Sequence, residues 1–148
     1  MIRLIDIKTI PQHWAVDLTW QLLEERPAEA SISHRQIQMP TWKQHEDYVL
    51  NHPYVAWYAI LNDDSIAVGT VLLTKHNEIG IAILLAYQRN GYAREAISEI
   101  MRMHDPAPAK PGERRGTFLA NVNPNNQASI ALFKSLGGRL IQFTYEMP

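Results

Sequence analysis

Cysteine is absent from the 148 residues of this chain. The absence excludes disulfide bonds, thiolate metal ligands and a cysteine nucleophile, so any group transfer has to proceed without a cysteinyl intermediate. The chain also lacks an apolar run near the roughly 18 residues that a membrane-spanning helix needs. Residues 1–10 have neither the basic start nor the apolar core of a signal peptide. We therefore expect a cytoplasmic protein with no membrane partner.

The chain has no large excess of either positive or negative charge. The chain carries 14 basic and 15 acidic residues, for a formal net charge of -1, which gives no global attraction for nucleic acid or for an anionic membrane. The six histidines show neither the His-Glu-x-x-His pattern nor another tight ligand spacing, so we expect no metal site. With 46% hydrophobic residues, the composition indicates one globular domain covering residues 1–148.

Hydrophobic periodicity, prolines and turn residues divide the chain into strands and helices. The isoleucine-rich strand is expected at the centre of the sheet, buried on both faces. Thr41 is the expected N-cap of the second helix. The order β-α-α-β-β-β-α-β-α-β predicts a single α/β domain. The expected strands are 3–8, 54–61, 66–74, 78–85 (the isoleucine-rich one), 117–122 and 140–147, and the expected helices are 13–26, 41–52, 94–104 and 124–136.

A short polar loop lies between the isoleucine-rich strand and the next helix. Its sequence, Gln88-Arg89-Asn90-Gly91-Tyr92-Ala93, fits the pattern Gln/Arg-x-x-Gly-x-Gly/Ala. A helix start offers unpaired N–H groups and partial positive charge, so this loop predicts a pyrophosphate site to which the arginines, including Arg94, add charge. Taken alone, such a six-residue pattern more often marks an ordinary glycine-containing turn. It is neither a P-loop nor Gly-x-Gly-x-x-Gly, which argues against nucleotide hydrolysis and a dinucleotide fold.

A second motif follows about thirty residues later, in the segment 121–138. With both motifs in place, the chain resembles the GNAT acetyltransferases, whose last helix has the form Asn-x-x-Ser-x-x-Leu-Tyr-x-x-x-Gly-Phe. The resemblance covers most of the chain, although the first fifty residues match only as a strand followed by two helices. The matching positions are Asn126, Ser129, Leu132 and Gly137.

The resemblance implies a central mixed, mostly antiparallel sheet flanked by helices, and acetyl-CoA as co-substrate. The strand end would pair with the pantetheine arm like an added strand, and an N–H of Ile81 or Ile83 would stabilise the oxyanion. The loop 88–93 and Arg94 would hold the pyrophosphate. The other positions that the resemblance assigns to the coenzyme site are Leu84, Asn126, Ser129 and Phe133.

The resemblance also marks a departure. The family's frequent general acid is a tyrosine, and Phe133 stands in its place with no proton for the leaving thiolate. A thiolate whose parent pKa is about 8.5 leaves tolerably, and losing acid catalysis costs about 10² to 10⁴ in rate, so activity is weakened and not forbidden. Tyr87 is our candidate substitute, with Tyr92 and Tyr145 as further options. Each is also readable as a packing aromatic.

A base is needed because an alkyl amine arrives mostly protonated. Glu78 is the candidate, since it opens the isoleucine-rich strand on the face of Gly80 and Ala82. A solvent-exposed carboxylate or a structural ion pair is an equally good interpretation of this residue. We expect His34, His45 and Trp57 to line an acceptor pocket, and Trp57 is also readable as a core residue.

These observations predict direct transfer of an acetyl group to a primary amine of a small molecule, for which an amino sugar is one candidate. A protein N-terminus or lysine is the alternative acceptor. A third hypothesis is a non-catalytic CoA-binding regulatory module, motivated by Phe133. The sequence leaves a monomer and a homodimer equally open.

Overall fold

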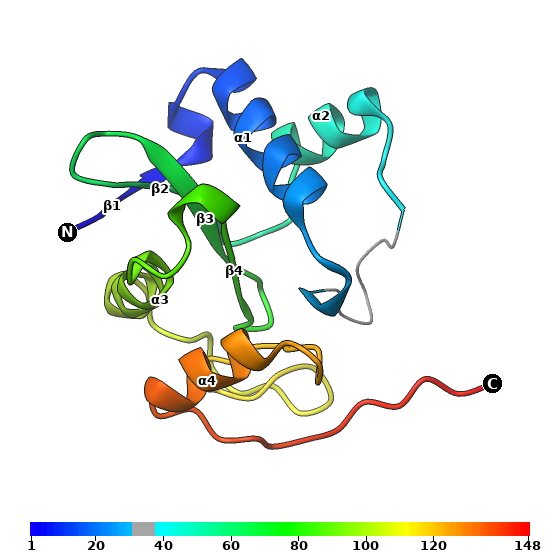
Figure 1. The fold of residues 1–148 in the computed structure, drawn as a ribbon. Coiled ribbons are helices and arrows are strands. Elements are labelled where there is room, and N and C mark those ends of the chain that lie inside the picture. Colours follow the sequence, from blue (N-terminus) through cyan, green and yellow to red (C-terminus); the bar gives the residue numbers. More distant parts are fainter. Residues whose placement is uncertain (31–37) are drawn as a thin grey trace.

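The computed structural model describes residues 1–30 and 38–148, and Figure 1 shows a four-stranded antiparallel sheet with helices on both faces. The strand order β1-β2-β3-β4 follows the sequence. The expected α/β class is therefore confirmed. The strands are β1 (Arg3–Asp6), β2 (Ala56–Leu61), β3 (Ala67–Leu73) and β4 (Ile79–Ile83), and the helices are α1 (Gln12–Glu25), α2 (Trp42–Leu50), α3 (Tyr92–Met103) and α4 (Gln127–Ser135), with short 3-10 turns η1 (Ile7–Thr9), η2 (Ala28–Ala30) and η3 (Leu85–Tyr87).

Each face of the sheet buries its own core. On one face, Trp57 of β2 packs in a cluster with Val16 of α1 and Val49 of α2. On the other, Ile60 of β2 packs in a cluster with Ile97 of α3. Because side chains alternate along a strand, β4 divides in the same way: its odd-numbered isoleucines belong to the α3 side and Leu84 to the α1 side.

Local sequence explains where α2 and α3 begin. Thr41 caps α2 as expected, and its hydroxyl and the Gln44 side chain form a reciprocal capping box. Gly91 precedes α3 with φ of 82°, a left-handed conformation that glycine adopts at little cost. The helix therefore begins at Tyr92 and not at the expected Arg94.

Gly69 allows β3 and β4 to pack closely. A Cβ placed on this residue would lie 2.2 Å from the carbonyl oxygen of Ala82, far inside van der Waals contact. Gly69 pairs with Ile83 in the antiparallel ladder. The position of β4 at its C-terminal end therefore depends on the missing side chain at residue 69.

The last two expected strands are not formed, and this is a correction. Residues 117–122 make only a single parallel bridge, Leu119 to Glu78, before the chain turns at Asn123–Asn126. The expected central strand β4 is therefore the edge of the sheet. Residues 140–147 pair with no strand in the described part of the chain and run as an extended segment (Figure 1), in which Phe143 is 73% exposed.

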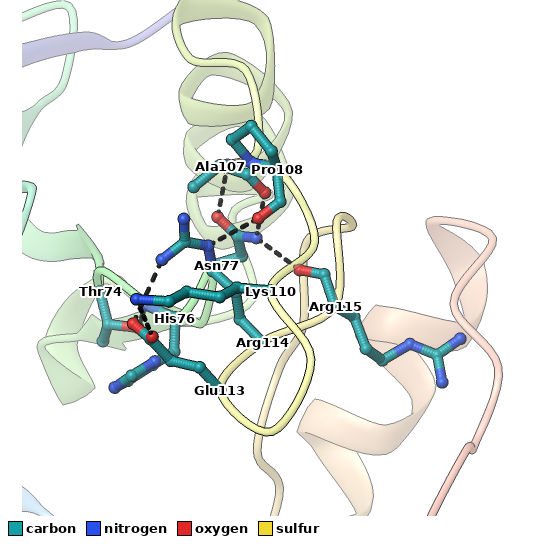
Figure 2. Close-up of polar contacts among 9 residues, drawn as sticks. All are labelled: Thr74, His76, Asn77, Ala107, Pro108, Lys110, Glu113, Arg114 and Arg115. Atoms are coloured by element: carbon teal, nitrogen blue, oxygen red, sulfur yellow. Dashed lines mark hydrogen bonds and ion pairs between the residues drawn. The ribbon is translucent and has the colours of Figure 1, made fainter.

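Asn77 joins the β3–β4 turn to the segment that follows α3 (Figure 2). Its side-chain amide donates to the carbonyls of Ala107 and Arg115 at 2.9 and 2.8 Å, and its side-chain oxygen accepts from the Ala107 N–H at 2.7 Å. The backbone N–H of Asn77 donates to the Thr74 carbonyl, and its carbonyl accepts from the Leu119 N–H. Asn77 is 2% exposed, and its three side-chain bonds are partly buried.

The φ of Asn77 is 68°, which asparagine tolerates better than most residues. Asn77→Gly keeps this backbone conformation but removes the amide, so we expect a loss of about 2 kcal/mol in the free energy of unfolding. Asn77→Ala adds left-handed strain and should lose about 1 kcal/mol more. Urea denaturation of both variants checks this, with the exposed Asn51→Gly as control. Equal stability of Asn77→Gly and the parent protein would contradict the clamp.

Candidate functional site

The edge of β4 that faces away from β3 offers free backbone groups. Leu84 N–H donates to Val68 and Glu78 C=O accepts from Thr74, so the even-numbered residues bond to β3. The N–H and C=O groups of Ile81 and the N–H of Ile83 consequently point to the open edge, while the Ile83 carbonyl accepts from the Gln88 side chain. An extended amide-bearing ligand can bond to such an edge like an added strand.

The loop 88–93 continues directly from this edge. Arg89 and Gly91 both have left-handed φ, 65° and 82°, and backbone turns with left-handed residues are common at anion-binding sites. The first helical bond of α3 is donated by the Glu95 N–H to the Gly91 carbonyl. The N–H groups of residues 92–94 thus have no partner within α3, and no side chain caps the helix. The arrangement suits an anion at the start of the helix.

Side chains inside the loop hold its shape. The Gln88 amide donates to the Ile83 carbonyl at 3.1 Å, and the Asn90 amide donates to the carbonyls of Tyr87 and Gln88 at 3.1 and 3.2 Å. These bonds tie the loop back to the end of β4. The edge and the loop therefore form one continuous surface of backbone groups.

The remaining predicted coenzyme residues lie on α3 and α4. Arg94 donates to the Ser135 hydroxyl at 2.6 Å, so its guanidinium joins α3 to α4. The Asn126 side chain accepts from the Ser129 N–H at 3.1 Å and caps α4. Phe133 packs partly buried against the α3-side core. Their assignment to the coenzyme stays a prediction.

Glu78 lies at the start of β4, on the α1 face of the sheet together with Gly80. One carboxylate oxygen accepts from the Thr74 hydroxyl at 3.1 Å, and the other accepts from the Asn121 side-chain amide. The side chain is half-buried. Glu78 is thus a fixed carboxylate at the point where β4 and the segment containing Leu119 separate.

Asn121 was not singled out from the sequence. The sequence could have indicated it, because Asn121 lies near the end of the expected strand 117–122. Such a strand would lie close to the isoleucine-rich strand that Glu78 opens. Tyr87, the candidate acid, ends η3 and packs against both core clusters. It therefore lies between β4 and the loop 88–93.

Two of the three predicted acceptor residues are in the core. His45 is 3% exposed, and its Nε2 lies 2.9 Å from the Thr19 hydroxyl and 3.1 Å from the Val16 carbonyl, which joins α2 to α1. Trp57 is 7% exposed and packs on the same face of the sheet. His34 lies outside the described residues. Their contact with an acceptor remains a prediction.

Comparison with known proteins identifies relatives. A family model described as an Acetyltransferase (GNAT) domain matches residues 5–139. No curated protein sequence gives a significant match. A putative acetyltransferase from Pyrococcus furiosus superposes with a TM-score of 0.62 at 14% identity, covering 100% of this chain and 99% of the other.

Two further solved structures have named acceptors. The spermidine/spermine N-acetyltransferase SpeG from Vibrio cholerae, in mutant forms, gives a TM-score of 0.62 at 16% identity over 92% of this chain and 78% of its own. AAC(6')-Iy, bound to the bisubstrate analogue CoA-S-monomethyl-acetylneamine, gives a TM-score of 0.55 at 16% identity. The match covers 99% of this chain and 98% of the other. At these identities the likeness concerns the fold.

Two features are absent from the described part of the chain. Within residues 1–30 and 38–148, no helix has the length and apolar character needed to span a membrane. Over the same ranges, no three His, Cys, Asp or Glu side chains gather closely enough to hold a metal ion.

Two histidines, His45 and His52, are buried in the fold. Burial lowers the pKa of His45 below its ordinary 6.5, opposed by the bond to the Val16 carbonyl. Burial lowers the pKa of His52 too, helped by the Lys8 ammonium and opposed by the Asp6 carboxylate. Both imidazoles thus bind protons more weakly in the folded chain than in the unfolded one.

Because the unfolded chain takes up these protons first, the free energy of unfolding should fall as pH drops below 6.5. The slope is at most about 1.4 kcal/mol per pH unit for each histidine. Urea denaturation at pH 7.5 and pH 5.5 measures the loss, which His45→Gln and His52→Gln should each reduce. The exposed His13→Gln is the control. An unchanged slope in both core variants would refute the assignment.

Proposed function

Because the chain belongs to the GNAT acetyltransferase family, we propose that it transfers the acetyl group of acetyl-CoA to a primary amine of a small molecule. The observation that carries the proposal is the unbroken run from the open edge of β4 to the uncapped start of α3. The outward-facing backbone groups of β4 can bond to the amides of the pantetheine arm, and the start of α3 can hold the pyrophosphate. The two parts of coenzyme A follow each other in the same order as these two parts of the chain.

The residues present fit this co-substrate. Ile81 and Ile83 would bond to the amides of the pantetheine arm through their backbone. The left-handed turn at Arg89 and Gly91 would direct the N–H groups of residues 92–94 at the pyrophosphate. A side chain at Gly91 would meet nothing within 4 Å, so the space beside the loop is open to a ligand.

The reaction is a direct acyl transfer. The neutral amine attacks the thioester carbonyl, a C–N bond forms, and the C–S bond breaks to release the coenzyme thiolate. A backbone N–H of Ile81 or Ile83 would stabilise the oxyanion. Glu78 would accept the amine proton, directly or through water, and Tyr87 would donate a proton to the thiolate.

The geometry around Glu78 supports its role as base. Thr74 and Asn121 hold the two carboxylate oxygens, so the group is oriented before a substrate arrives. Small amine acceptors are acetylated by SpeG, named for spermidine and spermine, and an amino sugar remains our candidate here because the AAC(6')-Iy analogue contains neamine.

Acetyl-CoA at about 100 times its dissociation constant should raise the free energy of unfolding by about 2.7 kcal/mol. Gly91→Glu should abolish this gain, because it places a carboxylate and a strained φ at the pyrophosphate site. The matched control is Gly112→Glu, which strains a φ of 77° in a surface loop. Thermal unfolding with and without acetyl-CoA measures the stability gain of each variant. A gain in Gly91→Glu equal to that of the parent protein would refute the site.

Glu78→Gln should lower the acetylation rate by about 10² or more while acetyl-CoA binding is unchanged. The residual rate should rise with pH, since more of the amine then arrives neutral. Thiol release from acetyl-CoA with a panel of amines gives the rate. Glu99→Gln is the control, because Glu99 pairs with Arg102 on the surface of α3. A rate equal to that of the parent enzyme would remove Glu78 from the mechanism.

A further inference from the structure

A carboxylate from α1 holds the first backbone N–H of the turn η3. The Leu85 N–H donates to Oε2 of Glu25 at 3.1 Å, across 60 positions of sequence. The other oxygen, Oε1, lies 3.5 Å from the Gln21 amide nitrogen. Glu25 is half-buried, whereas its neighbour Glu24 is exposed. The contact therefore connects the end of α1 to the chain just before the loop 88–93.

The helix dipole of α1 disfavours a carboxylate at this position. Glu25 is the last residue of α1, and the last turn contains no basic residue. The C-terminal end of a helix carries partial negative charge, so an acid there is unfavourable by about 0.3 to 1 kcal/mol. A charge-assisted bond to a backbone N–H more than offsets this cost. The bond to Leu85 thus favours a carboxylate at a position that the helix dipole disfavours.

The turn η3 needs a partner from elsewhere. Its cap residue Leu84 provides no side-chain bond, while the N–H groups of Tyr87 and Gln88 are used within the turn, on Leu84 and Leu85 carbonyls. Those bonds fix the shape of the turn but not its orientation. Contacts with other elements set the orientation. Tyr87 packs against both cores, and the Gln88 side chain bonds to Ile83 of β4. At the start of the turn, Leu84 bonds to β3 and Leu85 bonds to Glu25.

We propose that Glu25 is a positioning residue for the acetyl-CoA site, acting through the Leu85 N–H on the loop 88–93. The inference rests on the proposed use of acetyl-CoA. Held from both β3 and α1, the turn presents the N–H groups at the start of α3 in one orientation, so less conformational entropy is lost on binding. Without the carboxylate, the turn keeps its internal bonds and its apolar packing but loses its hydrogen bond to α1.

Calorimetric titration of acetyl-CoA into three variants tests this. Glu25→Ala should weaken acetyl-CoA binding about tenfold, the loss expected for a hydrogen bond to a charged group. Glu25→Gln should restore most of the affinity, because its amide oxygen still accepts from Leu85. Glu24→Ala is the matched control and should bind like the parent protein. Equal affinity in Glu25→Ala overturns the proposal.

Tighter binding in both Glu25 variants also overturns it, because the carboxylate would then only repel the pyrophosphate. A second readout needs no ligand: amide hydrogen exchange over residues 85–91 should accelerate in Glu25→Ala and return towards the parent rate in Glu25→Gln. Unchanged exchange contradicts the role of Glu25. Failure of the parent protein to bind acetyl-CoA refutes the proposed function, and the exchange experiment then decides the role of Glu25 independently.

Discussion

Four of the five hydrogen bonds of Asn77 join the sheet to the segment that follows α3, and the fifth closes the β3–β4 turn. Strands β1 to β4 form a continuous meander, but the segment after α3 has a single bridge to that sheet. The buried amide of Asn77 holds this segment by Ala107 and Arg115, and its carbonyl holds Leu119. The adjacent residue is Glu78, so the same turn also sets where the candidate base lies.

The open edge of β4 follows from how early this pairing stops. Ile79 donates to the Leu119 carbonyl at 2.8 Å, and the next outward-facing groups, those of Ile81 and Ile83, bond to no further strand among the described residues. Asn121 bonds to Glu78 with its side chain, where continued strand pairing would have used its backbone. The early end of this pairing shortens the sheet, and it also leaves the outer edge of β4 exposed at Ile81 and Ile83.

Most local features could be predicted from the sequence, and most long-range ones could not. The helices and first four strands have clear periodicity, and the loop 88–93 follows from Gly91 and the helix start. The failure at 117–122 and 140–147 has a physical cause, since a strand needs a partner edge that no local pattern specifies. His45 was taken for a pocket residue although Val49, one helical turn on, indicated an inward face.

Gly69 limits how this architecture can change over evolutionary time. The backbone of β4 lies where a Cβ on Gly69 would have to be, 2.2 Å from the Ala82 carbonyl. Nearly every other side chain of the sheet can be exchanged for one of similar volume with local repacking. Any side chain at this position would instead displace the whole edge strand. A substitution at residue 69 would therefore also move the backbone groups on the outer edge of β4, which a substrate would meet.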